Sequence, residues 1–201
     1  MKASITGALM LSIILLNVEE GTAQKINGLK YKSLKKVQCS KAAVVSAHPL
    51  ASKAGIRMLQ QGGNAIDAAI ATQLALAVVY PGAGNIGGGG FMVAHLKNGR
   101  NITIDYRETA PAASGRDMYL DSLGSPLMDL SQEGHLASGV PGTIAGLFAS
   151  LKYGRLPFKK LVQPAIDLAE TVVITSRQAE DLNELKNEFE RANTTLFCKK
   201  T

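Results

Sequence analysis

The stretch PGAGNIGGGGFMV, from Pro81 to Val93, lies between a long apolar segment and a predicted hairpin. Its residues Gly82 to Gly87 formally match the GxGxxG pattern of dinucleotide-binding proteins, and three more glycines follow. In those proteins the glycines follow a strand and open a helix, whose N-terminus binds the pyrophosphate. Here they follow a predicted helix and open a predicted strand, so the pattern fails its structural context. Two interpretations remain: a tight helix-to-strand crossing in a packed core, or a wall of N–H groups beside an active site.

The segment before the glycines predicts a central helix. Residues 65–79 are apolar except for Asp67, Thr72 and Gln73, a composition typical of a helix buried on most sides. Asn64 is a good N-cap, and Asp67 in the first turn favours the positive end of the helix dipole. The helix is too short to cross a bilayer, which takes about 20 residues.

The segment after the glycines predicts a β-hairpin. Residues 91–96 and 101–106 flank Asn98-Gly99, a dipeptide typical of tight hairpin turns. Ile102 and Ile104 alternate with polar residues, which indicates one buried face. The other expected elements are a short buried strand at 42–47 and helices at about 51–61, 143–153, 158–170 and 180–191, with Pro164 kinking or starting the third of these helices.

Composition is that of an ordinary globular protein. Of the 201 residues 46% are hydrophobic and 5% aromatic, with no Trp, so a stacking surface for single-stranded nucleic acid is not expected. Two cysteines and three histidines show no metal-ligand spacing. Cys39 and Cys198 lie near opposite ends, and nothing in the sequence indicates that they pair. We expect neither a metal site nor a nucleic-acid partner.

The N-terminus has the pattern of a secretory signal peptide at residues 1–23. Lys2 precedes an apolar stretch from Ala3 to Leu16, and small residues before Gln24 fit a cleavage site. An ordinary N-terminal helix and an uncleaved anchor are the alternatives. Residues 24–41 form a basic arm, which is solvated or contacts a membrane surface or a polyanion. We expect an exported protein, periplasmic or secreted.

Arg107 stands where the second hairpin strand ends, a place from which a side chain can lean over a cleft. Its guanidinium can hold a carboxylate with two parallel hydrogen bonds. From the residues alone, an ion pair with Asp105 or Glu108, or plain solvation, is the simpler interpretation. Glu108 is also a candidate general base, although adjacent Arg and Glu are common on surfaces.

His135 and Ser138 are a candidate base and nucleophile. Such a pair needs an orienting acid and an oxyanion site, and the sequence shows neither. We therefore interpret these two residues as helix-capping, and His48, which precedes Pro49, as structural.

Five motifs follow one another in an order that resembles the large-subunit half of γ-glutamyltranspeptidases. They are AHPLA (47–51), GGNAIDA (62–68), GGGGF (87–91), YRETAP (106–111) and SGVPG (138–142). The resemblance runs from about residue 41 to residue 191, and a series in family order is far more specific than any single motif.

The resemblance implies an α+β fold, the αββα sandwich of N-terminal-nucleophile hydrolases, with residues 42–195 as an incomplete large-subunit region. Family precursors cleave themselves into a large and a small subunit. The new N-terminal Thr of the small subunit attacks the γ-glutamyl amide of glutathione and related compounds, and the acyl group passes to water, an amino acid or a peptide. Because this Thr can use its own amine as the base, no metal or organic cofactor is implied.

On this resemblance Arg107 matches the arginine that binds the substrate α-carboxylate, and the glycine run matches a framework segment near the site. The family nucleophile lies in a Thr-Thr-His-like segment beyond residue 201, whereas Thr194-Thr195 is followed by Leu196 and stands too early. Residues 196–201 do not resemble the family, which predicts a truncated or frameshifted chain that is inactive alone.

The expected partners are a small γ-glutamyl substrate such as glutathione and the small subunit of the same precursor. Two alternatives stay open. One is a related acylase that acts on a β-lactam side chain such as glutaryl, whose carboxylate Arg107 would also fit. The other is a non-catalytic chain, either a truncated product or a ligand-binding remnant.

Overall fold

A computed structural model describes residues 38–192 of the chain. All of the described helices and strands fall in one compact unit that begins at Cys39. The predicted signal peptide, most of the basic arm and the segment 193–201 with Cys198 lie outside the described residues, so those predictions stay open. Among the described helices, none has both the length and the apolar character that a membrane span requires.

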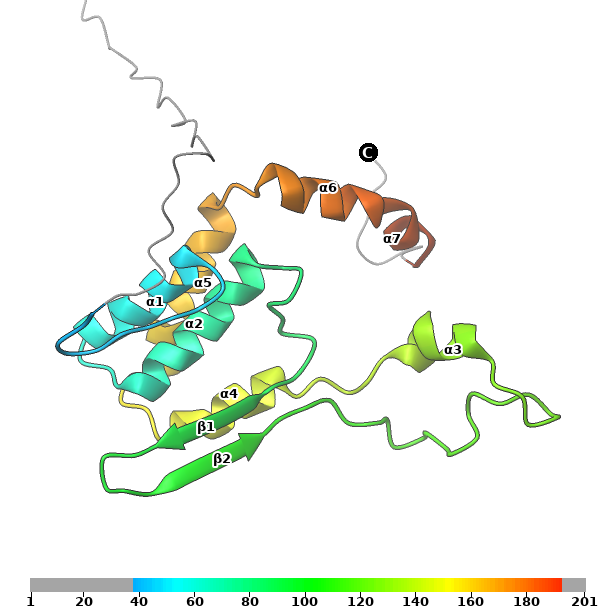
Figure 1. Ribbon diagram of the computed structural model, residues 1–201, viewed down its shortest axis with the longest axis horizontal. Helices are drawn as coiled ribbons and strands as arrows, with labels where there is room; N and C mark the ends of the chain where they lie inside the picture. Colours follow the sequence, from blue (N-terminus) through cyan, green and yellow to red (C-terminus); the bar gives the residue numbers. More distant parts are fainter. Residues whose placement is uncertain (1–37, 193–201) are drawn as a thin grey trace, which may run out of the picture. The chain divides into compact units, whose positions relative to one another are not determined.

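Four helices and one hairpin make up the packed part of this unit (Figure 1). The helices are α1 (Pro49–Gln60), α2 (Ala65–Val79), α4 (Thr143–Leu151) and α5 (Phe158–Thr171), and the strands are β1 (Phe91–His95) and β2 (Asn101–Asp105). α2 packs against α1 and α5, while α4 packs against α2 and β2. The helices therefore form a layer on one face of the hairpin.

The predicted central helix is confirmed as α2, and its start is fixed by a capping box. Asn64 Oδ1 accepts from the backbone N–H of Ile66 at 2.9 Å and of Asp67 at 3.2 Å. In return, Asp67 Oδ2 accepts from the Asn64 N–H at 2.7 Å. The two side chains thus satisfy backbone donors that the first helical turn leaves unpaired.

Asp67 also ties α2 to a distant part of the chain. Its carboxylate is fully buried and accepts from the N–H groups of Arg155, at 3.0 Å to both oxygens, and Leu156, at 3.1 Å. Among residues 38–192 no cationic side chain pairs with this carboxylate. Backbone N–H donors alone compensate its charge, and they anchor the α4–α5 connection to the N-terminus of α2.

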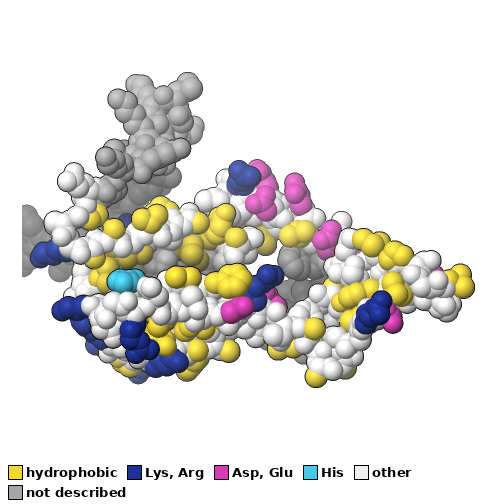
Figure 2. Space-filling view, turned by 60° about the horizontal axis from the view of Figure 1, so that its bottom comes forward, with side chains coloured by type: hydrophobic (Ala, Val, Ile, Leu, Met, Phe, Trp, Pro, Cys, Tyr) yellow, Lys and Arg dark blue, Asp and Glu magenta, His cyan; other side chains and the backbone are white. Residues whose placement is uncertain are grey.

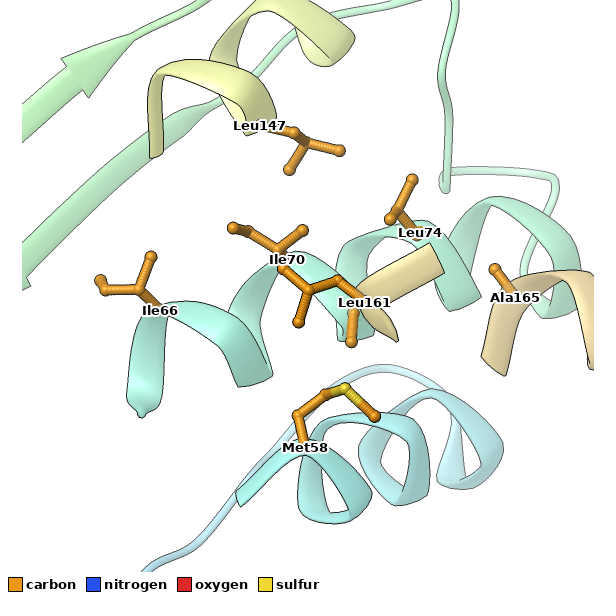
Figure 3. Packing of buried hydrophobic residues seen from close by; sticks show 8 residues of the cluster. Met58, Ile66, Ile70, Leu74, Leu147, Leu161 and Ala165 are labelled. Carbon is orange, nitrogen blue, oxygen red and sulfur yellow. The ribbon is translucent and has the colours of Figure 1, made fainter. Parts of the chain in front are cut away.

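The main core lies between the four helices, whose apolar side chains point toward one another (Figure 3). It consists of Met58 from α1, Ile66, Ile70, Ala71 and Leu74 from α2, Leu147 from α4, and Leu161 and Ala165 from α5. Met92 and Ala94 of β1 pack against it. Small residues (Ala51, Ala54 and Ala75) with Val79 form a second cluster between α1 and α2.

The hairpin forms as predicted, with one face buried and one open. β1 and β2 pair antiparallel from Phe91↔Asp105 to His95↔Asn101, and Gly99 in the turn has φ +81°. Ile102 is buried on the helix side, whereas Phe91 and Val93 on the other side are 63% and 78% exposed. Figure 2, in which the hairpin side is turned forward, shows hydrophobic side chains on this surface beside acidic and basic ones.

The strand predicted at 42–47 is not present. These residues have no regular secondary structure and pair with no described strand, and Val45 is 92% exposed. The prediction was wrong because apolar composition alone does not make a strand, which exists only where a neighbouring segment supplies hydrogen bonds. Within the described residues no segment pairs with 42–47.

The C-terminal helices also differ from the prediction. In place of one helix at 180–191 there are two, α6 (Ser176–Glu184) and α7 (Lys186–Ala192), and α6 starts early because Thr175 and Gln178 form a capping box. α5 continues through Pro164, which therefore does not set its start. Two short helices were not predicted, α3 (Met128–Gln132) and the 3-10 helix η1 (His135–Ala137).

Candidate substrate-binding site

The glycine run carries the chain from α2 to β1, and two of the four N–H groups of Gly87 to Gly90, those of Gly88 and Gly90, donate within the described residues. The Gly88 N–H donates to Asn85 Oδ1 at 3.0 Å. The Gly88 carbonyl accepts from the N–H groups of Gly142 and Thr143, which open α4, at 2.9 and 3.0 Å. The structure supports the interpretation of this loop as a packed crossing.

Close approach, rather than an unusual φ, requires glycine in this run. None of Gly87 to Gly90 has a positive φ. A β-carbon on Gly89 would lie 2.7 Å from the Cα of Arg107 and 2.8 Å from the N of Glu108, closer than real β-carbons approach other atoms. On Gly90 it would lie 2.8 Å from the ring of Tyr106. The run therefore lies directly against the strand end that carries Arg107.

Three motif segments that are far apart in the sequence meet at this strand end, namely 87–91, 106–111 and 138–142. Thr109 and Val140 exchange backbone hydrogen bonds of 3.2 and 2.8 Å. The Thr143 hydroxyl donates to Asn85 Oδ1 at 2.7 Å, which joins the glycine loop to α4. The family resemblance predicted that the glycine run lies near the Arg107 site, but nothing in the sequence indicated that residues 138–142 join them.

Arg107 is exposed, and its side chain lies on the open side of the hairpin. Its guanidinium carbon stands 5.8 Å from the centre of the Phe91 ring, in a cation–π arrangement. Among the described residues no carboxylate lies within salt-bridge distance of it. Asp105 instead accepts from the backbone N–H of Arg107 at 3.0 Å. The ion pair with Asp105 or Glu108 that the sequence allowed is thus not formed.

Tyr106 points in the opposite direction from Arg107, into the protein. It continues the strand ladder by one pair, because its N–H and carbonyl bond to Gly90 at 3.0 and 3.3 Å. Its hydroxyl donates to Gln73 Oε1 at 3.0 Å and lies 3.3 Å from the Phe91 carbonyl. Its ring fills a slot that is open only because Gly146 of α4 has no side chain.

Sequence reasoning missed this tyrosine and its partner. One signal was available, since Gln73 is one of three polar residues in an otherwise apolar helix. A cavity of about 660 Å³ lies beside them, and its lining includes Gln73, Tyr106, Phe91, Asn85 and residues 42–46.

The other candidate residues do not join the site. His48 caps α1, where its Nδ1 accepts from the Leu50 N–H at 3.2 Å, as a structural role predicts. His135 is the first residue of η1 and Ser138 follows its last residue. Neither side chain makes the capping bond that was predicted, and the N-cap of this helix is Gly134. Within residues 38–192 no group of three or more His, Cys, Asp or Glu side chains is arranged to hold a metal ion.

Chemically, the described residues offer a binding group rather than a reaction centre. Arg107 supplies a permanent positive charge and a planar set of donors that matches a carboxylate. Glu108 is exposed and makes no hydrogen bond through its side chain within the described residues, so nothing there prepares it as a base. The site is suited to binding the anionic group of a ligand whose reacting bond lies outside the site.

Comparison with known proteins identifies the family of the chain. The family model for gamma-glutamyltranspeptidase matches residues 51–200. This range extends past residue 195, so it gives no support to the predicted end of the large-subunit region at that residue. The glutathione hydrolase proenzyme of Escherichia coli strain K12 is 47% identical over 154 residues, which are 76% of this chain and 27% of that protein. The acylase ACY 1 proenzyme of Pseudomonas sp. strain V22 is 43% identical over 138 residues, 65% of this chain and 25% of that protein.

A solved structure confirms the predicted fold class. The crystal structure of Helicobacter pylori γ-glutamyltranspeptidase superposes with a TM-score of 0.73 at 50% identity, covering 78% of this chain and 46% of that one. The chain is thus an α+β part of an N-terminal-nucleophile hydrolase fold, and it spans about a quarter of the length of the curated relatives described above. With a family model matched over more than half of its residues, and with three of the motif segments gathered around Arg107, the chain belongs to the γ-glutamyltranspeptidase family.

Proposed function

We propose that this chain is the substrate-gripping part of an enzyme that cleaves the γ-glutamyl amide of glutathione and related compounds. The acyl group would pass to water, an amino acid or a peptide through a Thr acyl-enzyme. The nucleophilic Thr would come from a small subunit of the same precursor, outside this chain, and would use its own amine as the base. Expressed alone, the chain is expected to be inactive, because none of its described residues is arranged as a nucleophile with a base.

The observation that carries the proposal is the state of Arg107. Its guanidinium is exposed and carries no ion pair within the described residues, and the ring of Phe91 supports it from one side. An arginine held in this way has its hydrogen-bond donors free for a ligand carboxylate. A γ-glutamyl group carries such a carboxylate on its α-carbon, at the end remote from the bond that is cleaved.

The acylase alternative rests on a relative of comparable identity, the Pseudomonas acylase. Glutaryl has the same carbon chain and carboxylate as γ-glutamyl and lacks only the α-amine. Arg107 fits both acyl groups, so the carboxylate contact does not separate the two functions. The α-amine does.

The test uses the complete proenzyme, meaning this chain joined to the remaining length that its relatives have, and three anilide substrates. γ-Glutamyl anilide has the carboxylate and the amine, glutaryl anilide has the carboxylate alone, and 4-aminobutyryl anilide has the amine alone. We expect Arg107→Ala to lower kcat/KM for γ-glutamyl anilide about 30- to several-thousand-fold, the usual effect of leaving one member of a charge pair unpaired. Arg107→Lys should recover only part, because it keeps the charge and loses the fork.

Each result has a distinct meaning. The 4-aminobutyryl substrate should be poor with both enzymes and insensitive to Arg107→Ala, since it has no carboxylate to bind. Equal turnover of glutaryl and γ-glutamyl anilides would favour the acylase. An unchanged kcat/KM for γ-glutamyl anilide in Arg107→Ala would refute the carboxylate contact. Self-cleavage, followed by gel, should survive both Arg107 variants, and its loss would show that Arg107 is structural.

We further propose that the protein is exported to the periplasm or secreted, which the signal-like pattern of residues 1–23 supports. N-terminal sequencing of protein recovered outside the cytoplasm should begin at or near Gln24. An intact Met1 on the exported protein would refute cleavage at this point.

A further inference from the structure

The strand end that carries Arg107 is held at two points. On one side, the Gly90–Tyr106 backbone pair extends the hairpin ladder past the last residue of β2. On the other side, the Thr109–Val140 bridge fixes the chain after the motif. Arg107 lies between these anchors, so its position depends on how firmly residue 106 is held.

The side chain of Tyr106 adds a third anchor, which connects the strand end to the central helix. Its hydroxyl donates to Gln73 Oε1 at 3.0 Å, and Gln73 belongs to α2, the helix that packs against α1, α4 and α5. The same hydroxyl lies 3.3 Å from the carbonyl of Phe91, the residue whose ring supports the Arg107 guanidinium. One hydroxyl group thus links α2, β1 and the strand end.

The surroundings of Tyr106 show that this arrangement is specific. A β-carbon on Gly146 would overlap the Tyr106 ring, and one on Gly90 would lie 2.8 Å from it, so both neighbours leave room for the ring only as glycines. Gln73 is half-buried, and on an otherwise apolar helix its carboxamide has Tyr106 as its side-chain partner. A phenylalanine ring would fill the same slot, so packing alone does not explain the hydroxyl.

We propose that Tyr106 is a positioning residue for Arg107. Its hydroxyl is hydrogen-bonded to Gln73, and this bond fixes the strand end so that the Arg107 guanidinium is oriented to bind a substrate carboxylate. This inference rests on the proposed function, because it assigns Tyr106 an effect that is exerted only through Arg107. Residues 106 and 107 are successive and point to opposite sides of the hairpin. A rotation of the strand end that moves one side chain therefore moves the other.

The experiment is steady-state kinetics of the complete proenzyme with γ-glutamyl anilide and 4-aminobutyryl anilide. Tyr106→Phe keeps the ring and removes only the hydroxyl. It should raise KM for γ-glutamyl anilide about three- to tenfold with little change in kcat, because a lost neutral hydrogen bond loosens a contact made equally in the bound and transition states. Gln73→Met should give the same increase, and the double variant should add little to either single change.

Two comparisons separate positioning from a general structural effect. Tyr119→Phe is a matched control, since the Tyr119 hydroxyl donates to the Leu136 carbonyl at 2.7 Å, outside the Arg107 site, and it should leave KM unchanged. In an Arg107→Ala background, Tyr106→Phe should have no further effect on KM. Thermal melts of all variants report whether folding has changed.

The outcomes distinguish this inference from the function beneath it. If Arg107→Ala raises KM and Tyr106→Phe does not, the positioning role is refuted while the carboxylate contact stands. If Tyr106→Phe raises KM equally for the substrate without a carboxylate, its effect does not pass through Arg107 and the inference is again refuted. If Arg107→Ala itself leaves KM unchanged, the carboxylate contact is refuted, and the positioning role that depends on it is refuted as well.

Discussion

Replacing Asp67 with Asn is expected to loosen the junction between α2 and the α4–α5 connection. The carboxylate is fully buried and accepts hydrogen bonds from three backbone N–H groups, those of Asn64, Arg155 and Leu156. Asn has the same shape but replaces one acceptor oxygen with a donor. Whichever way the amide turns, at least one of the three buried N–H groups then faces another N–H.

The magnitude follows from these contacts. One buried donor left unsatisfied costs about 1–3 kcal/mol, and the remaining bonds fall from charge-assisted to neutral strength, a loss of about 1 kcal/mol more. We therefore expect the local opening free energy to fall by about 2–4 kcal/mol, which speeds amide exchange about 30- to 1,000-fold at the three donors. Asp67→Ala should be worse, because all three N–H groups lose their acceptor and a cavity is left.

Hydrogen exchange of the Asn64, Arg155 and Leu156 amides measures this directly and does not require cooperative unfolding of the chain. Asp117→Asn is the matched control, since the Asp117 side chain is exposed and only 3.7 Å from Arg116 in a surface pair. It should leave the three amides unchanged. If Asp67→Asn changes their exchange less than threefold, backbone donors are not what hold this carboxylate.

Three further outcomes follow from the structure. Gly89→Ala should destabilise the protein by about 1–3 kcal/mol and raise KM in the complete proenzyme, because the added β-carbon meets the backbone of Arg107. Gly87→Ala is the control: its β-carbon would meet nothing within 4 Å, so thermal melts and KM should both stay unchanged. The hydrogen bond from Gln163 lowers the pKa of Asp167, so Gln163→Ala should raise that pKa toward the ordinary carboxyl value. The stabilisation that Asp167 contributes is present above the pKa of the unfolded state and is lost as the pH falls through the pKa of the folded state. NMR titration of the Asp167 carboxyl carbon measures this pKa, and an unchanged midpoint in Gln163→Ala would show that another group is responsible. The isolated chain should self-associate through the open hairpin face, and Val93→Lys should reduce this in sedimentation while Val173→Lys, also exposed but outside the sheet, should not.

The elements that the sequence predicted well are those with a local cause. Asn64 and Asp67 lie three residues apart and form a capping box, and Asn98-Gly99 forms the hairpin turn, so short stretches of sequence determine where these elements begin. The split between α6 and α7 and the early start at Thr175 were missed, although the Thr175–Gln178 pair is a local signal of the same kind.

The features that were missed depend on distant parts of the chain. The bonds from Arg155 and Leu156 to Asp67 cross 88 and 89 residues, and that from Tyr106 to Gln73 crosses 33. No periodicity encodes such partners. The strand predicted at 42–47 is absent for a related reason. The composition of these residues is typical of a strand, but the hydrogen bonds of a strand must come from another segment, which the composition does not specify.

For Arg107, the residues alone and the family resemblance predicted different roles. The alternation of β2 places it at a strand end, yet the sequence alone favoured an ion pair or solvation. The structure removes the ion pair within the described residues and leaves the guanidinium on an open surface. Its assignment to a substrate carboxylate came from the family motif and stays a proposal that kinetics must test.

The exposure of Arg107 also limits what this chain can do alone. An arginine–carboxylate pair in water contributes about 0–1 kcal/mol, because both groups give up strong hydration and salt screens what remains. The same pair contributes several times more when water is excluded from around it. On the open face of the hairpin, beside Phe91 and Val93, the described residues provide no such cover. If Arg107 binds the substrate carboxylate as proposed, we expect it to do so selectively only when another part of the enzyme covers the exposed face, so that substrate binding and assembly of the complete fold depend on each other.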